Sequence, residues 1–81
     1  MQIVIVKFLD PTTFHDWVPI DFLDHSKPKL CEACGLLWEE NEDVVKVGLL
    51  TDEDKETASD WIVIPVGCVK SIEVVKELED G

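Results

Sequence analysis

The sequence predicts one small, mostly all-β domain spanning residues 1–81, with five short antiparallel strands that close into a barrel. A chain of 81 residues provides a single domain with a thin hydrophobic core. Its runs of β-branched and apolar residues are short and are separated by Pro, Gly, Asn and Asp, which is typical of strands and turns. No run has the length and the period of a long helix.

The first strand is expected at residues 3–8, which are dense in β-branched side chains. Pro11 ends it, because proline donates no hydrogen bond to a strand ladder. Residues 14–29 fit neither period and predict an irregular loop, with one short helical turn possible at residues 21–25. We expect the aromatic residues of this loop to cap the core. Trp17 would then cover one end of the barrel. The alternative is that Trp17 anchors an interface with a partner.

The other four strands are expected at residues 30–38, 44–51, 61–64 and 68–75. A polar turn at residues 39–43 joins the second and third strands into a hairpin. Residues 52–59 form a solvated acidic loop, and Pro65 ends the fourth strand. Residues 76–81 are expected to be a frayed tail, because chain ends are poorly ordered unless something holds them.

Alternation along the strands indicates which side chains face the core. In the third strand, Lys46 should face water. On that basis the inward side chains of the first and third strands are Val4, Val6, Phe8, Val45, Val47 and Leu49. Ile3 and Ile5 are left on the outer face, where either the 14–29 loop or another subunit must cover them.

The last strand contains a conflict of alternation. Lys70 should face water, but Cys68, Ile72 and Val74 share its parity. A bulge or turn near residues 67–69 would resolve the conflict. A proline break followed by a one-turn crossover into a last strand is how SH3-like and Sm-like barrels often close, so we expect a barrel of this kind.

In several features the sequence resembles small uncharacterised proteins encoded by tailed bacteriophages and prophages. These features are Trp17 after the first strand; Pro28, Cys31, Gly35, Leu36 and Leu37; the acidic turn 39–43 before Val44 and Val45; and Ile64, Pro65, Val69 and Ile72. The chain departs from the pattern at Cys34, where many relatives have valine, and at Leu36, where they have tryptophan. The resemblance implies a phage or prophage origin and action in the cytoplasm of a bacterial host, with no assigned activity.

Composition narrows the possible partners. The chain has 18 acidic residues against 7 lysines, no arginine and a net charge of −11. This charge disfavours direct binding to nucleic acids and to anionic membranes. The start of the chain has neither the basic region nor the apolar run of a signal peptide. The three cysteines are therefore expected to be reduced thiols in a cytosol.

Catalytic and metal-binding motifs are weak. The chain has no nucleophile elbow, no phosphate-binding glycine loop and no His-Glu helix motif, so we expect no enzyme activity and no cofactor. Cys31 and Cys34 could bind zinc together with Cys68 and either His25 or His15. However, residues three apart on a strand point to opposite faces, which favours small apolar thiols over a zinc site.

The leading hypothesis is an acidic protein-binding module that inhibits or modulates a bacterial host factor. Its partner would be a host or phage protein with a basic surface. The residues expected at the contact are Glu39, Glu40, Glu42 and Asp43, with Trp38 beside them, and Trp17. The acidic loop at residues 52–56, at the other end of the third strand, is the alternative contact. The alternatives are a homo-oligomeric assembly or minor virion protein, a small zinc domain and a nucleic-acid mimic. The acidic residues can also serve solubility alone.

Overall fold

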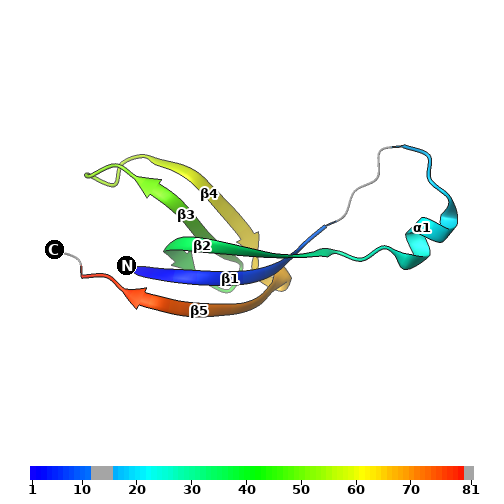
Figure 1. Ribbon diagram of the computed structural model, residues 1–81. Helices are drawn as coiled ribbons and strands as arrows, with labels where there is room; N and C mark the ends of the chain where they lie inside the picture. The colour runs from blue at the N-terminus through cyan, green and yellow to red at the C-terminus, as the bar shows by residue number, and fades with distance from the viewer. Residues whose placement is uncertain (12–15, 80–81) are drawn as a thin grey trace.

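The computed structural model describes residues 1–11 and 16–79, which form one five-stranded antiparallel sheet and one short α-helix. The strand order across the sheet is β4-β3-β2-β1-β5 (Figure 1). The elements in chain order are β1 (Gln2–Asp10), α1 (Ile20–His25), β2 (Lys29–Glu40), β3 (Val44–Thr51), β4 (Ala58–Pro65), the 3₁₀ turn η1 (Val66–Cys68) and β5 (Val69–Glu77). The predicted mostly β fold, with five strands and a short helix between the first two, is confirmed.

The tail is more ordered than predicted. β5 extends to Glu77, whose carboxylate accepts a hydrogen bond of 2.9 Å from the side-chain Nε2 of Gln2. The Leu78 amide then donates to the Met1 carbonyl at 2.9 Å. Pairing with β1 therefore holds this end of the chain, and the expectation of fraying from residue 76 is wrong. Residues 80 and 81, the rest of that expected tail, lie outside the described residues.

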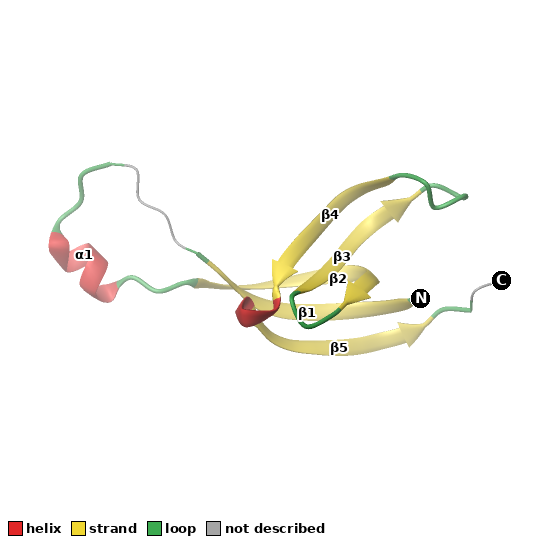
Figure 2. Ribbon diagram, turned by 180° about the vertical axis from the view of Figure 1, so that it is seen from behind, coloured by secondary structure: helices red, strands yellow, loops and turns green. Residues whose placement is uncertain are grey.

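The predicted closure into an SH3-like or Sm-like barrel is absent, and the sheet stays open with β4 and β5 as its two edges. Figure 2 shows the β3–β4 hairpin diverging from β1 and β5. Both edges are poorly suited to pair with each other. Asp60, within β4, has a φ of 60°, and register shifts at Lys70 and Val75 bend β5. The expected one-turn crossover is present, since η1 alone connects the two edges.

The core is formed by six buried side chains on one face of the bent sheet. They are Val4, Val6, Phe8, Val45, Val47 and Ile64. The inward side chains predicted for β1 are all confirmed. Leu49 is exposed, contrary to the prediction. The pairing of β2 with β3 ends at Leu36 and Gly48, so Leu49 lies in a part of the hairpin that extends past the core.

The conflict in the last strand is resolved as the alternation predicts. The 3₁₀ turn and the register shift at Lys70 reset the parity, so that Val69, Ile72 and Val74 lie opposite Phe8, Val6 and Val4. Val69 and Ile72 pack against the core. Val74 lies on the same face but is half exposed, because β5 is an edge strand with no further neighbour.

The β1–β2 connection is an arm that extends away from the sheet, and we use "the arm" for residues 16–28. Both ribbon views place α1 at its far end, remote from the strands (Figures 1 and 2). Trp17 is fully exposed, and Ile20, Phe22 and Leu23 are more than half exposed. The prediction that this segment caps the core is therefore wrong for its described residues; Phe14 lies outside them.

The direction of the arm follows from the register of the sheet. β1 and β2 stay paired as far as Asp10 and Lys29, so both strands leave the core side by side. The arm then continues along the strand direction. Consequently Ile3 and Ile5 are not covered by it and remain half-buried.

Among the described residues, no helix has the length and apolar character needed to cross a membrane.

Two glycines allow the sheet to bend where β2 meets β3. A Cβ atom built on Gly35 would lie within 3.0 Å of the Gly48 carbonyl oxygen, and one built on Gly48 would lie within 3.0 Å of the Trp61 ring. Real Cβ atoms essentially never come so close to other atoms. Gly67, in η1, has open space around the equivalent position.

We predict that Gly35→Ala and Gly48→Ala destabilise the fold by about 1–3 kcal/mol each, because the backbone or the indole must move to admit a methyl group. Gly35→Ala should cost more, since a backbone carbonyl yields less than a side chain. The matched control Gly67→Ala should change stability by less than about 0.5 kcal/mol. Urea unfolding followed by tryptophan fluorescence measures all three. Equal stability of the three variants would contradict this account of the bend.

Candidate functional site

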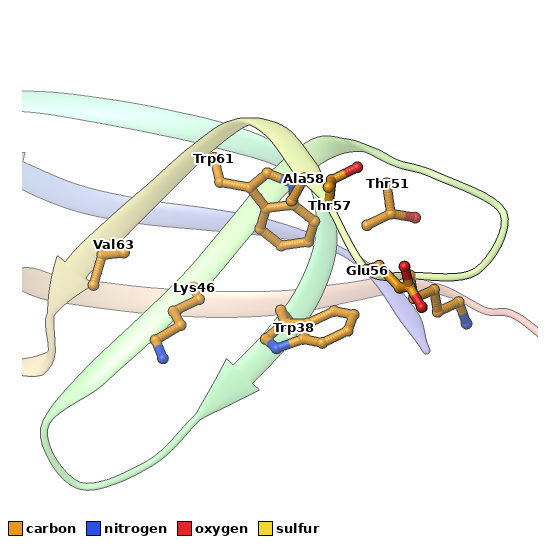
Figure 3. A pocket seen from close by; sticks show the side chains of 9 residues that line it. Trp38, Lys46, Thr51, Glu56, Thr57, Ala58, Trp61 and Val63 are labelled. Atoms are coloured by element: carbon orange, nitrogen blue, oxygen red, sulfur yellow. The ribbon is translucent and has the colours of Figure 1, made fainter.

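An aromatic surface, here called the tryptophan face, lies on the side of β2, β3 and β4 that points away from the core. It is formed by Trp38, Trp61, Lys46 and Val63 around a shallow open pocket (Figure 3). The pocket has a volume of about 260 Å³. Its full lining is Trp38, Lys46, Thr51, Lys55, Glu56, Thr57, Ala58, Trp61 and Val63.

Trp61 is held in place by its neighbours. It lies directly opposite Gly48 in the β3–β4 register, and its indole occupies the space that a side chain at residue 48 would fill. The indole Nε1–H donates a hydrogen bond of 2.7 Å to the Leu50 carbonyl. Burial of a tryptophan surface with its N–H satisfied gives a ring of fixed orientation.

Trp38 reaches the same face through an irregularity in β2. The register with β3 shifts between Leu37 and Glu39, so Trp38 has no direct partner across the ladder. Its ring meets that of Trp61 edge to face, with centroids 6.1 Å apart and planes at 84°. The side chain remains 49% exposed. The two tryptophans therefore pack against each other on the outer face, and one of them keeps a large accessible surface.

The four acids predicted at the contact differ in their availability. Glu39 lies opposite Lys46, and its carboxylate is 2.6 Å from the Lys46 ammonium. This hydrogen bond and the lysine charge lower the pKa of Glu39 below its ordinary value. Glu40 ends β2, Glu42 and Asp43 lie in the following turn, and all three are exposed. Glu39 thus already has a partner within the chain, whereas the other three project into solvent.

Side-chain oxygens shape both acidic turns. Asn41 Oδ1 accepts hydrogen bonds from the amides of Asp43 and Val44, at 2.8 and 2.9 Å. Asp52 Oδ1 accepts from the amides of Glu56 and Thr57, at 2.7 and 3.2 Å. The hydrogen bonds from these amides, that of Thr57 above all, lower the pKa of Asp52. Such side-chain-to-backbone bonds fix a turn and direct its remaining carboxylates outward.

The tryptophan face lies between these turns, which close the two ends of β3. The sequence predicted Trp38 and the acids of residues 39–43 at the contact, with the loop that holds Glu56 as the alternative, and it did not associate Trp61 or Lys46 with that surface. The hairpin register that pairs Gly48 with Trp61 could have revealed Trp61, because a glycine opposite a tryptophan leaves room for the ring. Nothing local to Glu56 indicates that its loop borders Trp38.

The remaining predicted residues lie elsewhere. Trp17 belongs to the arm and does not join the tryptophan face. Asp16, Asp21 and Asp24 are exposed on the same arm, and His25 Nδ1 lies 3.5 Å from the Asp21 carboxylate.

The cysteines are not brought together in the way a zinc site requires. Cys31 pairs with the inward Phe8 and Cys34 with the outward Ile5, so the two side chains occupy opposite faces of β2. Cys68 lies in η1 and His25 on the arm. Within residues 1–11 and 16–79, no group of three potential metal-ligating side chains converges. His15, the other candidate ligand, lies outside the described residues.

Comparison of the chain with protein-family models, curated proteins and solved structures finds no match. The resemblance to phage-encoded proteins therefore rests on the residues quoted for it. The chemistry of the arm and of the tryptophan face is the remaining guide to function.

Proposed function

We propose that this chain is an acidic protein-binding module that inserts its arm into a complementary surface of another protein. The observation that carries the proposal is the exposure of large apolar side chains on a segment remote from the chain's own core. Trp17, Ile20, Phe22 and Leu23 are all exposed there. Exposed apolar clusters of this kind mark interaction surfaces, and tryptophan is the residue most enriched among binding hot spots.

Charge supports a partner with a basic surface. The chain has a net charge of −11, and the arm carries Asp16, Asp21 and Asp24 among its apolar residues. Carboxylates around an apolar anchor steer association with a basic surface and disfavour acidic partners. The resemblance to phage-encoded proteins supports a bacterial source for that partner. Inhibition of a host factor is the role we propose for the complex.

A second candidate is a structural role as a homo-oligomer, for example in virion assembly. It is favoured by the open sheet, whose edge strand β5 exposes Val74 and Val75. Edge strands with exposed apolar residues can pair with a second chain. The net charge of −11 on every copy opposes such pairing, so we place this role second.

Replacing Trp17 on the arm by alanine should abolish capture of the partner protein. In affinity capture from bacterial lysate, the parent should retain a host protein that Trp17→Ala loses, with affinity for the purified partner reduced by about 30-fold or more. Because Trp17 is fully exposed, the variant should unfold at the same urea concentration as the parent. Leu49→Ala, which removes an exposed apolar side chain of β3 that belongs neither to the arm nor to the tryptophan face, is the matched control. Retention of the same protein by Trp17→Ala would refute the arm as the contact.

Neutralising the first acidic turn should slow association. The variant Glu40→Gln, Glu42→Gln, Asp43→Asn should bind the captured partner roughly tenfold more slowly at low salt, with little change at high salt. Glu39 is left intact because it pairs with Lys46. The matched variant Glu53→Gln, Asp54→Asn, Glu56→Gln removes the same charge from the other loop. Stopped-flow association rates compare them. If the second variant slows association more, the charged contact lies at the other end of β3. If neither variant slows association, the acids serve solubility alone.

Light scattering during size exclusion separates the two candidate functions. We expect the mass of a monomer at micromolar concentration in low salt, because like charges repel. A stable dimer or larger assembly under these conditions would favour the structural role instead.

A further inference from the structure

The tryptophan face has the chemistry of a receptor for one cationic side chain. It lies on a different part of the molecule from the arm, so it stands or fails independently of the arm's proposed role. Its walls are two indoles held nearly perpendicular, and one of them is fixed by the hydrogen bond from Trp61 to Leu50. Figure 3 shows the two indoles at the pocket, which Glu56 also lines.

Size limits the occupant. The pocket is about 260 Å³ and open to solvent. Pockets that enclose whole drug-sized molecules are usually about 300–1,000 Å³ and deeper. A single side chain presented by a larger molecule therefore fits this site better than a free metabolite does.

The charged residues in and around the pocket favour a cationic occupant. Lys46 and Lys55 line the pocket, but Lys46 is occupied by Glu39 at 2.6 Å. Glu56 also lines the pocket, and its carboxylate makes no ion pair among the residues that the structure describes. Local charges thus balance, and the carboxylates beyond them decide the sign of the potential. Those carboxylates belong to Glu40, Glu42 and Asp43 on one side and to Asp52, Glu53 and Asp54 on the other.

The geometry favours arginine among the cations. A guanidinium is planar, stacks on an indole face and donates two parallel hydrogen bonds to one carboxylate. The accessible surface of Trp38 and the side chain of Glu56 line the same pocket and offer these two contacts. Lysine has only the point charge. The chain contains no arginine, so none of its own side chains can occupy the site in this way.

We infer that Trp38 and Glu56 bind an arginine side chain from an exposed basic segment of a partner protein. The guanidinium stacks on Trp38 and donates to Glu56, while Trp61 closes the other wall. This is a reversible contact of modest affinity for a single residue, and several basic residues near it would be attracted by the two acidic turns.

A titration with short capped peptides tests the inference. The probe is acetyl-Gly-Arg-Gly-amide added to ¹⁵N-labelled protein, and the readout is the set of indole N–H resonances. We expect saturable shifts for Trp38 and Trp61 and none for Trp17, which serves as an internal control on the arm. The lysine peptide should bind several-fold more weakly, and the citrulline peptide, which keeps the shape but lacks the charge, should give no saturable shift.

Two surface variants supply the matched comparison. Glu56→Gln should weaken binding of the arginine peptide roughly five- to tenfold, because it removes a charge-assisted hydrogen bond. Glu53→Gln removes the same charge from the same loop without lining the pocket and should change binding less than about twofold. Both side chains are exposed, so the fold should be retained. Equal shifts with the citrulline peptide, equal effects of the two variants, or no saturable shift in the parent would each overturn the inference.

Discussion

The close approach of β2, β3 and the Trp61 ring at Gly35 and Gly48 is the constraint on which both surfaces of the sheet depend. With no side chain at either position, β3 can cross close over β2 and bring Val45 and Val47 onto Val4 and Val6. On the outer side, the same absence leaves the space that the Trp61 indole fills. The core and the tryptophan face are therefore two consequences of one bend, and a change at either glycine acts on both.

The core that this bend creates is small, and much of the fold follows from its size. Six buried side chains anchor β1, β3 and β4, whereas β5 contributes only partly buried residues. An 81-residue domain has little apolar material beyond this. The edges consequently stay open and the arm stays outside. Stability therefore comes mainly from the six buried side chains of β1, β3 and β4.

Sequence reasoning succeeded where short-range rules decide the outcome. The inward positions of Val45 and Val47 follow from the period of a strand beside Lys46, and the hairpin turn at Asn41 follows from local hydrogen bonding. The reset of parity after Pro65 was likewise deducible from the conflict at Lys70. Each of these depends on residues that are close together in the chain.

Prediction from the sequence failed where the structure depends on pairing between residues that are far apart in the chain. Leu49 is exposed because β2 and β3 part at Gly48, and no pattern within β3 shows where that happens. Trp17 is exposed because the register of Asp10 with Lys29 directs the arm away from the core. The sheet stays open with β4 and β5 as its edges, and neither the positive φ of Asp60 nor the register shifts of β5 can be read from a single sequence. For the candidate site, Trp38 was identified as an aromatic beside acids, but its contact with Trp61 depends on a register shift that a single sequence does not show.

The register of Asp10 with Lys29 has an evolutionary consequence. Because the two strands are already paired where the arm departs, the arm is in effect an insertion at the tip of a hairpin. Its length and residues can drift, or be exchanged for another segment, while the sheet is conserved. Under the proposed function, a change in this one contiguous stretch of the gene would change the target and leave the sheet intact.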